Sequence, residues 1–444
     1  MSISGDTMLR RKAWETFEDW LAAPTWKALL VRGTRQVGKS YLAAAFADEH
    51  FNHVAKFDLV LDREARASFE LASSPDDLLL RISVAADKPL VSGDTAIIID
   101  EVQEAPNIVT LVKGLVQRGD FRYILTGSLL GVKLENIDSL PVGYATQLEM
   151  YPLDFEEYCW ARGLSPDAFD MARGYAGAEE PLPDFLYERM TRLYHEYLLV
   201  GGMPDAVATF TASGSIDDVR DVHAGIHALY RDDITKYAPK GLRLTIREIY
   251  DLIPSEIGSK NKRFRLSSIT DVKRFSQVTD DFLWLSNAGV ALPVHNVNAP
   301  VAPLLVAEQR NLFKLFYLDV GMLASCYPKR QTLGLLDGRA DMNMGGVYES
   351  AVAQQLKAHG FALRYFTSKK VGELDFLAES MDGSVCAIEV KSGSGYLTHA
   401  ALDNALGTRG YTIDRAIVLA ETNVRRCGPI LYLPAFCASI LEYE

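Results

Sequence analysis

Short apolar runs alternate with amphipathic stretches between Trp26 and Met150. Helix-like segments separate most of these runs, and such alternation is typical of a parallel sheet covered on both faces by helices. The pattern therefore predicts an α/β fold for this part of the chain, with buried strands at residues 27–32, 53–60, 95–100, 121–128 and 144–150.

The pattern changes at Tyr151. A segment rich in aromatic residues and then in Gly, Pro and acidic residues runs to about Leu186, and it indicates a boundary. Helical periodicity returns over residues 187–210 and 217–238.

Between Leu242 and Tyr327, short helical patterns precede two strand-like runs, an order that suggests a winged-helix-like module. A helix and short strands follow from Gly345 onward and predict a second, smaller α/β domain.

Composition narrows the class of protein. The chain has 444 residues, enough for two to four domains, and 46 basic against 58 acidic residues give a net charge of −12. This balance argues against a surface that is basic throughout and binds nucleic acid or membrane everywhere. Five cysteines without a CxxC spacing argue against a disulfide scaffold or a zinc ribbon. With no secretory signal and no apolar run of membrane-spanning length, we expect a soluble cytoplasmic protein without a membrane partner.

A phosphate-binding loop follows the first predicted strand. The string GTRQVGKS fits the pattern GxxxxGK[ST] and opens a predicted helix. Glycines let successive N–H groups face phosphate oxygens, Lys39 would reach the β- and γ-phosphates, and the Ser40 hydroxyl would bind Mg²⁺. The predicted nucleotide-binding residues are Gly33, Thr34, Arg35, Gln36, Val37, Gly38, Lys39, Ser40 and Tyr41.

Two acids end the strand at residues 95–100. At the C-terminal edge of such a sheet, Asp100 would hold Mg²⁺ and Glu101 would orient or deprotonate the attacking water. The next strand ends in Thr126-Gly127-Ser128, where Thr126 or Ser128 would sense the γ-phosphate, or Ser128 would simply cap a helix. The predicted catalytic residues are Lys39, Asp100, Glu101 and Ser128, with ATP and Mg²⁺ as cofactors.

Several strings together resemble one family. GTRQVGKS, DEVQEAP, ILTGS and PVGYATQLEMYPLDFEEYCWA, followed by HEYLLVGGMPDAV, YRDDITKYA and FKLFYLDVGML, resemble bacterial and archaeal AAA-type ATP-binding proteins. The resemblance implies an N-terminal AAA-type ATPase domain and a C-terminal domain of unknown function. Many members have Gly-Arg where this chain has Gly143-Tyr144, so an arginine finger is not assigned, and Arg35, Arg118 and Arg122 remain candidates.

A basic stretch interrupts the acidic chain. Ten basic and four acidic residues between Lys236 and Arg274 give +6. A helix beginning near Ser267 would then face a nucleic-acid groove, while the alternative is a solvated basic face or a contact with an acidic neighbouring domain. The basic residues are Lys236, Lys240, Arg243, Arg247, Lys260, Lys262, Arg263, Arg265, Lys273 and Arg274.

Acidic residues and one lysine recur near the C-terminus. Glu389 and Lys391 share one face of a predicted strand, and a neighbouring strand can bring Asp375 beside them. With Glu349 on the preceding helix, they resemble the D…ExK core of PD-(D/E)xK nucleases, although Leu374 stands where that motif has Pro. An ordinary half-exposed sheet is the alternative.

The leading hypothesis is an ATPase that couples hydrolysis of ATP to ADP to an output on DNA, RNA or a protein partner. The alternative is a nucleotide-gated scaffold with an inactive nuclease-like domain, and the oligomeric state is left open. The predicted regions are a P-loop AAA-type ATPase domain (1–150), a helical linker region (151–240), a winged-helix-like domain (241–335) and a PD-(D/E)xK nuclease-like domain (336–444).

Overall fold

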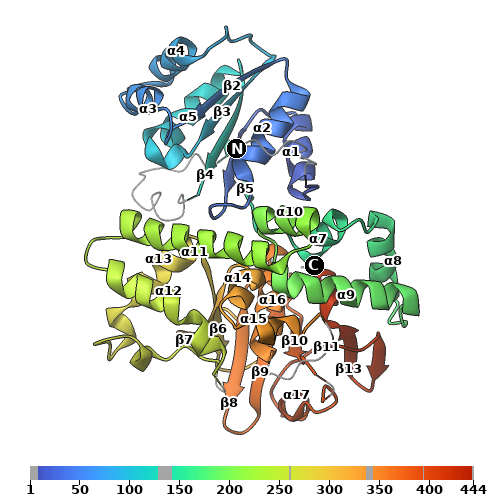
Figure 1. Cartoon of the computed structure of the whole chain (residues 1–444). Helices are drawn as coiled ribbons and strands as arrows, with labels where there is room; N and C mark the ends of the chain where they lie inside the picture. The colour runs from blue at the N-terminus through green and yellow to red at the C-terminus, as the bar shows by residue number, and fades with distance from the viewer. Residues whose placement is uncertain (1–8, 129–142, 260–261, 337–343, 394, 443–444) are drawn as a thin grey trace. The chain divides into compact units, whose positions relative to one another are not determined.

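The computed structural model describes residues 9–128, 143–259, 262–336, 344–393 and 395–442. Its contacts divide the chain into two units. We call residues 10–151, with 287–289, the N-terminal unit, and residues 152–286 and 290–444 the C-terminal unit. Figure 1 gives the labels of their helices and strands.

The N-terminal unit contains a five-stranded sheet in the order β2-β3-β4-β1-β5, and every neighbouring pair is parallel. This finding confirms the predicted α/β fold. The second strand stops earlier than expected because the Asp58 carboxylate accepts hydrogen bonds from the N–H groups of Val60 and Leu61 and turns the chain. The strands are β1 (Ala28–Arg32), β2 (His53–Asp58), β3 (Thr95–Asp100), β4 (Arg122–Gly127) and β5 (Ala145–Glu149).

Helices cover both faces of this sheet (Figure 1). Alternate strand residues, including Leu30, Ile97 and Leu125, form a buried core with α3, α4 and α5. On the other face lie α1 and α2, whose Phe17 and Phe46 rings pack 5.1 Å apart. Burial on both faces explains why the strands are continuously apolar. The helices are α1 (Ala13–Ala22), α2 (Lys39–His50), α3 (Arg63–Glu70), α4 (Pro75–Ala85) and α5 (Asn107–Arg118), with a 3-10 turn η1 (Val102–Glu104).

The C-terminal unit contains an eight-stranded mixed sheet in the order β12-β13-β11-β10-β9-β8-β6-β7. Its strands are β6 (Ala291–Val297), β7 (Glu308–Tyr317), β8 (Arg364–Ser368), β9 (Gly372–Glu379), β10 (Val385–Val390), β11 (Arg415–Ala420), β12 (Arg425–Cys427) and β13 (Ile430–Pro434).

Helices supply the rest of this unit. They are α7 (Phe155–Ala161), α8 (Pro166–Gly177), α9 (Asp184–Val200), α10 (Pro204–Ser213), α11 (Ile216–Tyr237), α12 (Arg243–Ile257), α13 (Thr279–Asn287), α14 (Val320–Ser325), α15 (Lys329–Leu333), α16 (Gly345–Ala358) and α17 (Ala400–Leu406), with 3-10 turns η3 (Leu266–Ser268), η4 (Phe275–Gln277) and η5 (Ala435–Ser439).

The expected winged-helix module differs from the structure. The predicted strand pair exists as β6 and β7, but β6 pairs in parallel with β8, so both strands belong to the same sheet as the C-terminal strands. In place of a helix beginning near Ser267, the chain makes the short turns η3 and η4. Glu256 holds this segment, because its carboxylate accepts hydrogen bonds from Arg265 and Ser268.

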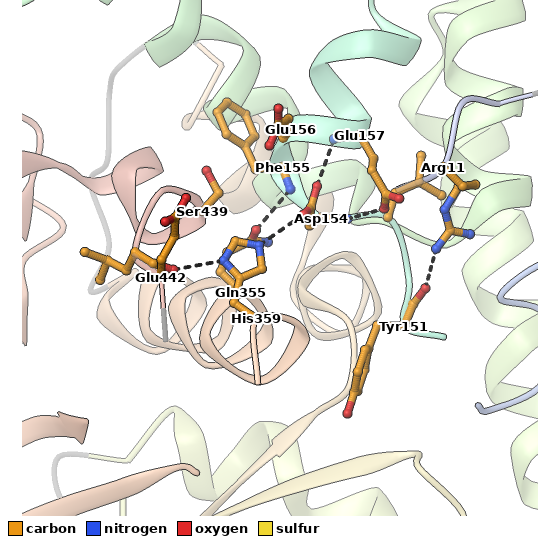
Figure 2. Close-up of polar contacts among 12 residues, drawn as sticks. Arg11, Tyr151, Asp154, Phe155, Glu156, Glu157, Gln355, His359, Ser439 and Glu442 are labelled. Carbon is orange, nitrogen blue, oxygen red and sulfur yellow. Dashed lines mark hydrogen bonds and ion pairs between the residues drawn. The ribbon is translucent and has the colours of Figure 1, made fainter. Parts of the chain in front are cut away.

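The segment expected to be a boundary is mostly helical. Asp154 begins α7 through a capping box, in which its carboxylate accepts from the Glu157 N–H and Glu157 accepts from the Asp154 N–H. In Figure 2, the same N-terminus contacts α16: the Phe155 N–H donates to Gln355 at 3.1 Å, and His359 lies 3.1 Å from Asp154. These contacts fix α7 within the C-terminal unit.

Among the residues that the structure describes, none of the helices combines the length and the apolar character that crossing a membrane requires.

Candidate functional site

The loop between β1 and α2 has a backbone that depends on its glycines. Gly33 has a φ of 144°, and a Cβ there would lie 2.2 Å from the Met150 backbone oxygen at the end of β5. Gly38, which precedes α2, has a φ of 90°. Both backbone conformations favour glycine, so the positions of the two glycines follow from the geometry of the loop.

Lys39 follows this loop as the first residue of α2. Its side chain is buried, and its ammonium donates a 2.8 Å hydrogen bond to the Thr34 backbone oxygen. Burial lowers the pKa of Lys39 to about 8, although Glu101 and Asp100 act in the opposite direction. A buried cation therefore contacts the loop, and two carboxylates favour its charged form.

Ser40 and Tyr41 are exposed in the first turn of α2. The first N–H groups of a helix have no partner within the helix, and the helix dipole adds positive potential there. With the Lys39 ammonium at the same helix end, this arrangement suits a phosphate group.

Asp100 lies at the end of β3. β4 separates β3 from β1, so the polar end of β4 lies between Asp100 and the loop. The Thr126 hydroxyl donates to Oδ1 of Asp100, which also accepts from the Glu101 N–H at 3.0 Å. The end of β4 thus places a polar side chain, Thr126, beside Asp100.

Glu101 is held by side chains from two elements. Its backbone is left-handed, with a φ of 53°, a conformation that non-glycine residues seldom adopt. Oε2 of Glu101 accepts hydrogen bonds from the Ser128 hydroxyl at 2.9 Å and from the Gln103 side-chain amide. These donors fix the carboxylate in one orientation at the edge of the sheet.

This edge offers the oxygen ligands that Mg²⁺ prefers. Ser40 lies in the first turn of α2 and Asp100 ends β3. β4 lies between β3 and β1 in the sheet. Ser40 and Asp100 are thus the residues with oxygen donors that could hold a magnesium ion at this edge.

Sequence reasoning missed Arg11. Its buried guanidinium donates to the backbone oxygens of Val37, at 2.8 Å, and Tyr151, at 2.7 Å, and Figure 2 shows the second contact. Arg11 thus ties the phosphate loop to the end of the sheet. No local pattern marks it, because both acceptors are backbone atoms distant in sequence.

Two arginine-finger candidates have structural partners in the N-terminal unit. Arg118 forms ion pairs with Asp76 and Asp120. The Arg122 guanidinium lies 4.2 Å from the centre of the Trp26 ring and donates to the Leu21 backbone oxygen. Both side chains therefore stabilise their own unit.

A second group of charged side chains lies in the C-terminal unit. Asp375 on β9 accepts from the Val390 N–H at 2.9 Å, and Lys391 donates to Glu389 at 2.7 Å. Burial and the nearby Asp375 raise the pKa of Glu389 to about 7. Asp375, Glu389 and Lys391 are thus neighbours, as the sequence predicted.

Lys314, which sequence reasoning missed, joins Glu349 to this group. Its Nζ lies 3.2 Å from Glu349 and 3.6 Å from Asp375. Lys262 forms a second ion pair with Glu349. Among the described residues, no set of three or more His, Cys, Asp or Glu side chains is arranged to hold a metal ion.

The basic stretch divides into two kinds of residue. Lys262 and Arg265 pair with acids of the same unit, and Arg243 donates to the Ala238 backbone oxygen. Lys260 lies outside the described residues. The exposed basic side chains of the stretch include Lys236, Lys240, Lys273 and Arg274.

Three protein-family models match separate regions of the chain. Residues 25–159 match a model described as an AAA domain. Two models described as domains of unknown function, DUF8612 and DUF4143, match residues 191–333 and 344–425. The N-terminal part is therefore similar to AAA domains. No curated protein matches the chain in sequence.

Solved structures give weak likenesses. A Walker-type ATPase of Pyrococcus abyssi is 14% identical, with 72% of this chain and 95% of that chain covered and a TM-score of 0.43. The Aeropyrum pernix ORC1 protein in complex with DNA is 13% identical (75% and 93% covered, TM-score 0.25). The Thermotoga maritima RuvB branch migration motor is 11% identical (69% and 92% covered, TM-score 0.30). At these scores the three likenesses carry no functional conclusion for this chain.

Proposed function

We propose that the N-terminal unit binds ATP together with Mg²⁺ and hydrolyses it to ADP and phosphate. The observation that carries this proposal is the strand order. With β4 between β3 and β1, the phosphate loop, the Asp100–Glu101 pair and the Thr126–Ser128 end lie at one edge of the sheet.

Binding would use the loop and the start of α2. The N–H groups from Gly33 to Ser40 would face the phosphates, Lys39 would neutralise the β- and γ-phosphates, and the exposed Tyr41 would lie beside the nucleotide. Lys39 would then exchange its bond to the Thr34 backbone oxygen for phosphate oxygens.

Ser40 and Asp100 would hold the magnesium ion, which when bound neutralises charge on the phosphates. Thr126 would keep the Asp100 carboxylate in place through its hydroxyl.

Hydrolysis would use Glu101 as the group that orients or deprotonates water. Its charge acts on the buried Lys39, whose pKa it raises against the effect of burial. Ser128 and Gln103 would act as positioning residues, because they donate to Glu101.

Phosphate release tests the assigned site. Wild type should hydrolyse ATP, Lys39→Ala should lose binding and turnover, and Glu101→Gln should bind ATP but turn it over far more slowly. Lys56→Ala, at an exposed lysine paired with Asp48, is a matched control that should behave as wild type. Equal rates in Lys39→Ala, Glu101→Gln and wild type would refute the assigned site.

We further propose that the output acts on nucleic acid through the exposed basic residues of the C-terminal unit. Lys236, Lys240, Lys273 and Arg274 are exposed, and such side chains neutralise phosphates. A protein partner would be the alternative output. Either would link ATP turnover to a change in the C-terminal unit.

A mobility shift with DNA and RNA in rising salt tests this output. Lys273→Glu/Arg274→Glu should weaken binding, whereas Lys369→Glu, an exposed site outside the stretch, should not. Absence of binding at low salt would remove the nucleic-acid proposal and leave the protein partner. ATPase rates with and without DNA or RNA then show whether the two units are coupled.

A further inference from the structure

Lys314 on β7 is a fully buried lysine whose ammonium faces three carboxylates. Its Nζ lies 2.7 Å from Glu373, 3.2 Å from Glu349 and 3.6 Å from Asp375. Its side chain is 0% exposed. Glu373 and Glu349 lie within hydrogen-bonding distance of this ammonium, and Asp375 lies slightly farther away as an ion-pair partner.

The surrounding carboxylates also have other partners. Lys262 pairs with the other oxygen of Glu349, and Lys391 donates to Oε1 of Glu389. The Val390 N–H donates to Oδ2 of Asp375. We call Glu349, Glu373, Asp375 and Glu389, with Lys262, Lys314 and Lys391, the buried charge cluster. Its four acids face three lysines.

We infer that the Lys314 ammonium occupies the position of a divalent cation in the buried charge cluster, so that the wild-type cluster binds no Mg²⁺ or Mn²⁺ and does not cut nucleic acid. This inference is independent of the ATPase proposal, because it concerns only residues of the C-terminal unit.

The geometry of the cluster supports the exclusion of a divalent cation by Lys314. A divalent cation would have to lie roughly 2.0–2.6 Å from carboxylate oxygens, in the space that Nζ of Lys314 occupies between Glu349 and Asp375. Its charge would also repel a buried ammonium where water screens little.

Lys314 is also poorly placed to act as the lysine of a hydrolytic site. A catalytic lysine must reach water or a phosphate, and Lys314 is completely buried. Lys391 has the position that the ExK pattern gives to that lysine, and it is partly exposed. The chain therefore keeps the lysine of the nuclease pattern and adds a second one among the acids.

One oxygen indicates where a metal would bind if Lys314 were absent. Oε2 of Glu389 is buried and has no hydrogen-bond partner among the described residues. Removing the Lys314 ammonium would leave Glu349 and Asp375 without that compensating cation. The cluster is thus a latent metal site that Lys314 closes.

Titration of the nucleotide-free full-length chain with Mn²⁺ in a calorimeter tests the inference. Lys314→Met keeps most of the side chain's length and removes its charge. This variant should bind Mn²⁺ more tightly than wild type by about tenfold or more, the scale on which groups beyond the ligands alter metal affinity. Adding Asp375→Asn to Lys314→Met should abolish the gain. Lys370→Met, at an exposed lysine, is the matched control and should leave Mn²⁺ binding unchanged.

Three results would overturn the inference. They are wild-type Mn²⁺ binding that Asp375→Asn removes, plasmid cleavage by wild type that Asp375→Asn removes, and a folded Lys314→Met variant without added binding. If Lys314→Met unfolds, recovery of its native circular dichroism in Mn²⁺ supports the inference. If Lys314→Met stays unfolded in Mn²⁺, the comparison of wild type with Asp375→Asn tests the inference. Equal Mn²⁺ binding by the two proteins, with no plasmid cleavage by either, supports a closed site. Weaker Mn²⁺ binding by Asp375→Asn, or plasmid cleavage that depends on Asp375, refutes it. These outcomes do not depend on whether the N-terminal unit hydrolyses ATP.

Discussion

The Ser128 hydroxyl, just after β4, donates a 2.9 Å hydrogen bond to Oε2 of Glu101, just after β3. The two residues are 27 positions apart in sequence, and the parallel pairing of β3 with β4 brings their strand ends together. The carboxylate that we propose as the water-activating group therefore has its orientation set by the neighbouring strand.

Replacement of Ser128 by Ala should lower the kcat of ATP hydrolysis about tenfold or more and leave ATP affinity nearly unchanged. Glu101 would lose a hydrogen bond to a charged group, worth about 1.5–3 kcal/mol, and about 1.4 kcal/mol corresponds to a factor of ten in rate. Steady-state phosphate release and equilibrium binding separate the two parameters. Ser83→Ala, at an exposed serine of α4, is the control, and a raised KM with normal kcat would contradict the positioning role.

ATP affinity should decrease as the pH rises above about 8. Burial lowers the pKa of Lys39 to about 8, and phosphate beside the ammonium would raise it. Above that pH the free protein has largely lost the proton, so binding must take one up. Calorimetry in buffers of different ionisation enthalpy should detect this uptake. Proton release on binding, or none at pH 9, would speak against a lysine–phosphate contact.

Arg11→Ala should weaken ATP binding about tenfold and lower the melting temperature. The substitution removes two hydrogen bonds, each worth about 1 kcal/mol, that join Val37 in the loop to Tyr151. Fluorescent-nucleotide titration and thermal unfolding measure the two effects. Arg11→Lys can satisfy one carbonyl at best and should recover only part of the affinity. Arg63→Ala, at an exposed arginine of α3, should change neither quantity.

Asp319 should make the stability of the C-terminal unit depend on pH. Its buried carboxylate accepts hydrogen bonds from the N–H groups of Gly202 and Met322, yet burial raises its pKa to about 6. Because its pKa is raised, protonated Asp319 stabilises the folded state. This contribution is complete below the pKa of Asp319 in the unfolded chain, near 4, and is lost as the pH rises through 6. The shift corresponds to about 3 kcal/mol.

Urea denaturation of wild type and Asp319→Asn between pH 4 and pH 7 measures this dependence. The variant should be less stable at pH 4 and should lack the Asp319 part of the slope. Its amide N–H₂ would face backbone donors, a mismatch that costs about 1–3 kcal/mol. Parallel pH profiles for the two proteins would assign the slope to other groups, such as Glu389.

Local pattern was sufficient for the first unit. The strands around residues 95–100 and 121–128, the glycines of the loop and the acids at the strand end depend on backbone periodicity and on short-range geometry. Each of these features depends on residues that are close together in the sequence, so it could be predicted from the sequence alone. Asp375, Glu389 and Lys391 were likewise predicted to be neighbours, because they follow from strand alternation and one strand pairing.

What the sequence determined by itself is the α/β unit with its phosphate loop and the acidic positions of the second cluster. Only the tertiary structure decided which side chains contact these residues. Arg11 donates to the phosphate loop, Ser128 donates to Glu101, and Lys262 and Lys314 form ion pairs with Glu349. It also placed β6 in the same sheet as β8, where the sequence had suggested separate modules. The physical reason is that local periodicity shows which side of an element is buried, whereas contacts between distant segments depend on how those buried sides pair.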